Sequence, residues 1–85
     1  MDGLHIAWLG GNCPVQAEGS VAGKGFYFRA RGVRWTMGIG GDPVGDPEWE
    51  MSERYGEGPY DAGWMPEDDA RGFIEKAAAA YLDQT

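Results

Sequence analysis

The chain has 85 residues, a net charge of −7 and a single cysteine, Cys13. This length suits one domain covering residues 1–85, and the lone thiol excludes an intramolecular disulfide. No apolar run approaches the roughly 20 residues of a membrane-spanning helix, so we expect no membrane association. The absence of a partner thiol and of a secretory signal favours the reducing cytoplasm.

The first 39 residues predict an antiparallel β-meander. Residues 4–9 form an apolar stretch that is consistent with a first strand. Three later stretches alternate apolar and polar side chains with the period of two of a half-buried strand; they are residues 15–20, 26–31 and 33–39. Short glycine-containing turns separate them, so we expect three or four strands. The apolar face consists of Val15, Ala17, Phe26, Phe28, Trp35 and Met37.

Residues 40–65 predict a long acidic loop that is rich in glycine and proline. Pro43, Pro47 and Pro59 interrupt the segment, and no sustained period is present. A short helical turn is expected around residues 48–54. Loops of this length in small domains are often functional, which directs attention to its charged side chains.

Residues 66–83 predict a C-terminal helix. Pro66 suits the first helical position, and the acidic residues 67–69 are favourable at the positive end of the helix dipole. The helix has one apolar stripe, made of Ala70, Phe73, Ile74, Ala77 and Tyr81. We expect this stripe to pack on the apolar sheet face. The predicted fold is therefore α+β, with an antiparallel meander of three or four strands covered on one face by one helix.

The sequence contains no convincing catalytic or metal-binding group. Cys13 and His5 are the only candidates for a nucleophile and its base, and they lie near opposite ends of a predicted strand. One histidine and one cysteine fall short of the ligands that zinc requires, and the acidic segment lacks EF-hand spacing. We predict a protein that is not an enzyme and that uses neither a cofactor nor a metal ion.

Charge is divided unevenly along the chain, which suggests a partner-binding surface. Residues 1–39 carry four basic side chains against two carboxylates, a balance of +2, whereas residues 40–85 carry three against twelve, a balance of −9. The acidic residues serve either solubility or the imitation of nucleic-acid phosphates in the basic groove of a protein partner. The predicted acidic surface consists of Asp42, Asp46, Glu48, Trp49, Glu50, Glu53, Glu57, Asp61, Glu67, Asp68 and Asp69.

The alternative surface is the sheet face turned away from the helix. Its predicted members are Tyr27, Arg29, Arg31 and Arg34. These residues either bind an anion or single-stranded nucleic acid, or are solvated and pair with Glu18 and the acidic loop. Because a net charge of −7 opposes direct nucleic-acid binding, we favour the acidic surface and a protein partner.

Two segments carry a resemblance to a known family. Residues 8–19, WLGGNCPVQAEG, and residues 26–32, FYFRARG, followed by Trp35, resemble a family of short proteins encoded by phages and prophages. The chain is also similar to small anti-CRISPR proteins directed at type I systems, such as the type I-C group. This resemblance implies a non-enzymatic inhibitor in the host-cell cytoplasm. Such an inhibitor binds the CRISPR surveillance complex and blocks recognition of target DNA.

Overall fold

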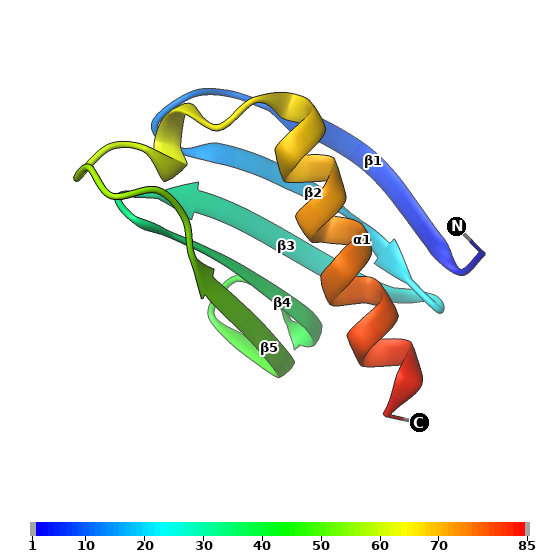
Figure 1. Cartoon of the computed structure of the whole chain (residues 1–85). Coiled ribbons are helices and arrows are strands. Elements are labelled where there is room, and N and C mark those ends of the chain that lie inside the picture. The colour runs from blue at the N-terminus through cyan, green and yellow to red at the C-terminus, as the bar shows by residue number, and fades with distance from the viewer. Residues whose placement is uncertain (1, 85) are drawn as a thin grey trace.

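A computed structural model describes residues 2–84 of the protein. Five antiparallel strands form one sheet in chain order, and one helix crosses a single face of it (Figure 1). The elements are β1 (Leu4–Gly10), β2 (Val15–Val21), β3 (Lys24–Arg31), β4 (Arg34–Asp42), β5 (Asp46–Arg54), the 3-10 turn η1 (Ala62–Trp64) and α1 (Glu67–Asp83). The α+β prediction is confirmed, with five strands in place of three or four. Neither helical segment in residues 2–84 has the length and apolar character needed to cross a membrane.

The fifth strand lies where the sequence predicted a loop with a helical turn, so this part of the prediction is wrong. β4 continues to Asp42, the chain reverses within three residues, and β5 pairs with β4 from Asp46 to Arg54. β5 is an edge strand that hydrogen-bonds on one side, which allows it to contain Pro47 and several charges. The connection between β5 and α1 is therefore limited to residues 55–66, which include the 3-10 turn η1.

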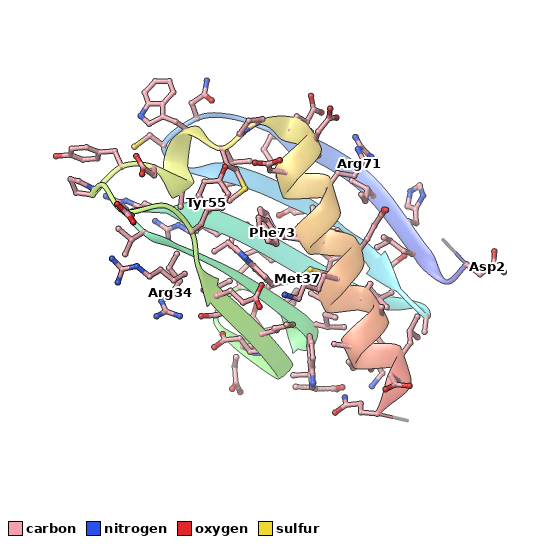
Figure 2. All side chains as sticks on the ribbon, viewed as in Figure 1. Asp2, Arg34, Met37, Tyr55, Arg71 and Phe73 are labelled. Carbon is pink, nitrogen blue, oxygen red and sulfur yellow. The ribbon has the colours of Figure 1, made fainter. Side chains whose placement is uncertain are left out.

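The core lies between α1 and the sheet face that the alternating pattern predicted. All six predicted apolar sheet residues are buried, as are Ala70, Ile74 and Ala77 of the helix stripe. Trp35 lies at the centre, stacked on Phe28 and Phe73 with ring centroids 5.7 and 5.2 Å apart. Figure 2 shows Phe73 and Met37 in this layer and Arg34 projecting outside it. One face of the sheet therefore supplies the stability of the domain, and the opposite face does not take part in the core.

The segment between β5 and α1 is fixed to one end of the sheet by backbone hydrogen bonds. The N–H of Tyr55 donates to the carbonyl of Val33 at 2.7 Å, and the N–H of Ala62 donates to that of Gly32 at 2.9 Å. These bonds hold the crossing to α1 at the end of the β3–β4 hairpin. No helix of residues 2–84 covers the sheet face opposite α1 (Figure 1).

Candidate functional site: the open face of the sheet

The side chains of the open face are arranged in cross-strand rows. Because Phe26, Phe28 and Ala30 are buried against α1, the residues that alternate with them on β3 point to the opposite side. The strand register places one residue of each neighbouring strand beside them. One row contains Trp8, Glu18, Tyr27, Gly38 and Glu50, the next contains Gly10, Gln16, Arg29, Thr36 and Ser52, and the last contains Arg31, Arg34 and Arg54.

The arginine row, Arg31, Arg34 and Arg54, places three like charges on three adjacent strands. Arg34 lies directly opposite both Arg31 and Arg54, and all three side chains are exposed. Arg34 donates a hydrogen bond of 2.7 Å to the hydroxyl of Ser52. Directly opposed like charges destabilise a strand pair, so the arginine row lowers the stability of the free protein. A bound anion would offset this repulsion.

No arginine of the open face forms an ion pair with a carboxylate of residues 2–84. The three ion pairs of this part of the chain involve Lys24, Arg71 and Lys76. The alternative that the face arginines pair with Glu18 and the acidic loop is therefore wrong. Arg29 is also without an ion pair in this range, and it extends the positive charge from the arginine row toward Tyr27.

Two neighbouring hollows lie on the open face along β3 and β4. The first, of about 320 Å³, is bordered by Arg29, Arg31, Arg34 and Thr36. The second, of about 280 Å³, lies below the β4–β5 turn; we call it the tip pocket, and it is lined by Tyr27, Arg29, Thr36, Gly38, Pro43, Val44 and Glu50. Arg29 and Thr36 border both hollows, so the two are neighbours on the open face.

Gly38 allows the turn to fold over the open face. A Cβ atom at this position would lie 2.6 Å from the carbonyl oxygen of Pro43 and 2.9 Å from Cβ of Pro47. Both distances are shorter than real Cβ contacts, so a side chain at position 38 would displace the turn. The β4–β5 turn therefore packs directly on Gly38, beside the tip pocket.

The predicted acidic surface is distributed over different parts of the molecule. Glu50 lies on the open face, whereas Glu48 pairs with Lys24 at 2.6 Å and Glu53 pairs with Lys76 of α1 at 2.7 Å. The hydrogen bond and charge of Glu48 raise the pKa of Lys24 above its ordinary value. Neighbouring acidic residues of β5 therefore have different partners and directions.

Other acidic residues stabilise the segment between β5 and α1. The Asp61 carboxylate accepts the backbone N–H groups of Glu57 and Gly58 at 3.0 and 2.9 Å, which lowers the pKa of Asp61. The Asp69 carboxylate accepts the Tyr55 hydroxyl at 2.7 Å, which raises the pKa of Tyr55. These carboxylates have local partners that account for their positions.

The remaining carboxylates of the predicted surface are exposed at the ends of elements. Asp42 and Asp46 lie opposite each other at the β4–β5 turn, where Asp42 accepts a backbone N–H at 3.2 Å. Glu67 and Asp68 lie in the first turn of α1, where the helix dipole favours negative charge. Oε1 of Glu67 lies 3.8 Å from a guanidinium nitrogen of Arg71. The turn and the helix start are separate parts of the fold.

The aromatic residues of β5 and of the segment that follows it have different environments. Trp49 packs edge-to-face on Tyr81 of α1 with ring centroids 5.4 Å apart, and Tyr55 packs similarly on Phe73 at 5.8 Å. Trp64 remains 62% exposed. Trp49 of the predicted acidic surface thus belongs to the edge of the core, whereas Trp64 is an exposed apolar side chain.

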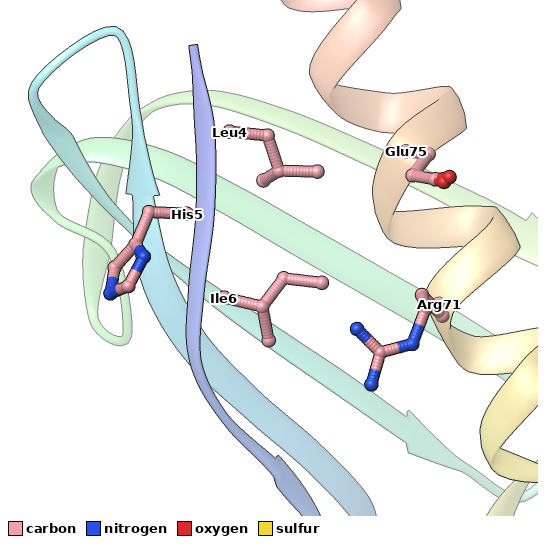
Figure 3. Close-up of a pocket in the computed structure, with 5 residues that line it drawn as sticks. All are labelled: Leu4, His5, Ile6, Arg71 and Glu75. Atoms are coloured by element: carbon pink, nitrogen blue, oxygen red, sulfur yellow. The ribbon is translucent and has the colours of Figure 1, made fainter. Parts of the chain in front are cut away.

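The two residues considered for nucleophilic chemistry are far apart. His5 is near the start of β1 and points away from α1 (Figure 3), whereas Cys13 follows the far end of that strand. At about 3.3 Å per residue, the part of β1 from His5 to Gly10 alone spans about 17 Å, and Cys13 lies beyond its end. Residues 2–84 also contain no group of three or more histidine, cysteine, aspartate or glutamate side chains that could hold a metal ion.

A third hollow, of about 260 Å³, lies between β1 and α1 (Figure 3). Leu4 and Ile6 point into it from the strand, and Arg71 and Glu75 border it from the helix. The apolar wall belongs to the edge of the core, and the helix contributes one charge of each sign. This hollow lacks the concentration of one charge that marks the arginine row.

Sequence reasoning missed Arg54 and Trp8 as members of the open face. Trp49 and Met51 alternate with Glu50, Ser52 and Arg54, which is a strand signal that the prolines and glycines around it obscured. Trp8 joins the face because the β1–β2 register shifts between Ile6 and Trp8. A shift of this kind has no local sequence signature.

The net formal charge is positive on the open face and negative over the rest of the molecule. Arg29 and the arginine row oppose Glu18 and Glu50, a balance of +2, and the remaining side chains sum to −9. No family model, curated protein or solved structure matches the chain.

Proposed function

We propose that the protein is a non-enzymatic module that binds single-stranded nucleic acid on the open face of its sheet. The observation that carries the proposal is the arginine row, whose three exposed guanidinium groups have no carboxylate partner within residues 2–84. Guanidinium groups bind phosphate oxygens bidentately, and a phosphate chain removes the repulsion within the row.

The dimensions of the row favour a chain of phosphates over one small anion. Neighbouring strands are about 4.8 Å apart, so the row covers about 10 Å from β3 to β5. Arg29 and the two hollows continue the site along the strands. Tyr27 and the half-exposed Trp8 lie on the same face and offer rings on which bases can stack.

The net charge of −7 is compatible with this function because the open face itself is positive, with Arg29 and the arginine row outnumbering Glu18 and Glu50. Carboxylates on the α1 side are separated from the open face by the thickness of the domain, whose shortest extent is 19 Å. The Debye length at physiological salt is about 8 Å, so these charges are largely screened. The local balance of the open face then decides the interaction.

Fluorescence anisotropy with labelled ten-nucleotide oligonucleotides in 50 mM NaCl tests the proposal. We expect salt-dependent binding by the natural protein. The triple variant Arg31→Gln, Arg34→Gln, Arg54→Gln should lose at least about tenfold in affinity. The matched control Lys24→Gln, Arg71→Gln, Lys76→Gln removes the same charge elsewhere and should bind within about twofold of the natural protein. No binding by the natural protein, or equal losses in both variants, would overturn the proposal.

The inhibitor hypothesis stays a prediction. Its acidic residues lie on several elements, and Glu48, Glu53 and Asp69 have partners within the domain, which favours the open face as the contact surface. The resemblance to phage-encoded proteins is tested by direct binding to a purified type I surveillance complex. Reversal of charge at Glu48, Glu50, Glu53 and Glu57 should abolish that binding if the acidic surface carries it.

A further inference from the structure

Two aromatic side chains are exposed at the end of the sheet that carries the arginine row. Tyr60 is 65% exposed and Trp64 is 62% exposed, and both lie in the connection between β5 and α1. We call this pair the aromatic end. Neither side chain forms a hydrogen bond within residues 2–84, whereas the hydroxyls of Tyr27 and Tyr55 do. Neither packs against the core, so the stability of the domain does not account for them.

The aromatic end is attached to the turn that joins two members of the arginine row. Only two residues separate Arg31 from Arg34, and their carbonyl groups accept the backbone N–H groups that fix the connection to the sheet. A Cβ atom at Gly32 in this turn would lie 3.7 Å from the carbonyl oxygen of Pro59, the residue before Tyr60. The backbone of Tyr60 is therefore within about 12 Å of that of Arg31. The aromatic end and the arginine row are neighbours.

The backbone that carries the two rings is held in place by its own bonds. The carboxylate of Asp61 accepts two backbone N–H groups, and the N–H of Cys13 donates to the carbonyl of Gly63 at 2.6 Å. Ala62 and Gly63 are buried, so these small residues attach the segment to the sheet and the ring of Trp64 does not. Aromatic rings on a fixed backbone offer contact area at a low cost in conformational entropy.

The charges around the aromatic end favour a nucleic-acid strand of one orientation. Glu57 and Asp61 lie within three residues of Tyr60 and repel phosphate, whereas the arginine row attracts it. Phosphates therefore stay on the row, and the uncharged bases reach the rings. Surfaces that bind single strands combine cationic grooves with stacking rings, and OB folds of this kind cover about 4–16 nucleotides. A strand of this length extends from the row to the aromatic end.

We propose that unpaired bases of the bound strand stack on Tyr60 and Trp64 while its phosphates remain on the arginine row. The strand then leaves the open face over the β3–β4 turn, where the connection crosses to the α1 side of the sheet (Figure 1). This inference rests on the proposed function. It assigns a stacking site for bases beside a row that contacts only the backbone, and it states at which end of the sheet the strand leaves.

Anisotropy titrations with a labelled ten-nucleotide oligothymidylate in 50 mM NaCl test the stacking site. The double variant Tyr60→Ala, Trp64→Ala should lose at least about tenfold in affinity. The double variant Tyr60→Phe, Trp64→Phe should stay within about threefold of the unsubstituted protein, because it keeps two stacking rings. Val44→Ala is the matched control, since it truncates an exposed apolar side chain at the opposite end of β4. It should change the affinity by less than about twofold.

A ligand without bases separates stacking from charge. Inorganic polyphosphate should bind the double alanine variant as tightly as it binds the unsubstituted protein. Oligothymidylate, but not polyphosphate, should quench a part of the tryptophan fluorescence that Trp64→Phe removes. Equal oligonucleotide affinity in the alanine variant, with salt-dependent binding intact, would overturn the stacking site and leave the proposed function standing. An equal loss of polyphosphate binding would also overturn it, and failure of the unsubstituted protein to bind the oligonucleotide would overturn both.

Discussion

Removing the arginine row should change how nucleic-acid affinity responds to salt. For single strands, the slope of log K against log salt is about −0.7 per neutralised phosphate. With one phosphate for Arg29 and for each member of the row, the slope is about −2.8. Between 50 and 200 mM NaCl the affinity should then fall about 50-fold. In the variant with Arg31→Gln, Arg34→Gln and Arg54→Gln, one contact remains, so the slope is about −0.7 and the fall about threefold.

Anisotropy titrations at five NaCl concentrations measure both slopes. The charge-matched control, with Lys24, Arg71 and Lys76 replaced by glutamine, should keep a slope of about −2.8, since its lost charges lie outside the open face. If the unsubstituted protein has a slope of log K against log salt flatter than about −1, the prediction is wrong, because the row then releases few counterions. An unchanged slope in the arginine variant would show that the phosphates contact another surface.

Three further predictions concern stability and titration. Arg34→Glu should place a carboxylate opposite two arginines and stabilise the free protein by about 1 kcal/mol in urea unfolding while abolishing oligonucleotide binding; lower stability with retained binding would contradict it. Gly72→Ala, at an exposed helix position with open space for a Cβ, should stabilise by about 1 kcal/mol and raise Tm by about 4–8 °C without changing binding; an unchanged Tm would contradict it. The hydrogen bond to Asp69 raises the pKa of Tyr55 above 10.0, so its contribution to stability is complete below pH 10 and is lost as pH rises through the raised pKa. Ultraviolet titration should find a tyrosine midpoint above 10.0 that Asp69→Ala lowers, and the same midpoint in both proteins would contradict this assignment.

The parts of the fold that follow from local periodicity were predictable. The period of two in residues 15–39 identified three strands and the buried face, and the helical stripe placed the C-terminal helix at residues 66–83, within one residue of α1. β5 could not be recognised in the same way, because Pro47 and the charges around it resemble a loop. Its pairing with β4 provides the stabilisation that its local sequence does not indicate.

The candidate site was predictable only within one hairpin. Alternation along residues 26–36 placed Tyr27, Arg29, Arg31 and Arg34 on one face, as the structure has them. The addition of Arg54 depends on the register between β4 and β5, and a shift of one residue would turn its side chain to the other face. That register depends on the three-residue turn 43–45 and on Gly38, which no pattern of charge or hydropathy indicates.

The arginine row is not accounted for by protection of a sheet edge. Charged side chains on an edge strand discourage pairing with other chains, which explains Arg54 on β5. Arg31 and Arg34 lie on the interior strands β3 and β4, where no free edge exists. Solubility would be served equally by alternating charges, and that arrangement would stabilise the strand pairs instead of opposing them. Because the core on the α1 face supplies the packing, the open face can carry this unfavourable cluster, and the proposed anionic ligand would give the cluster a function.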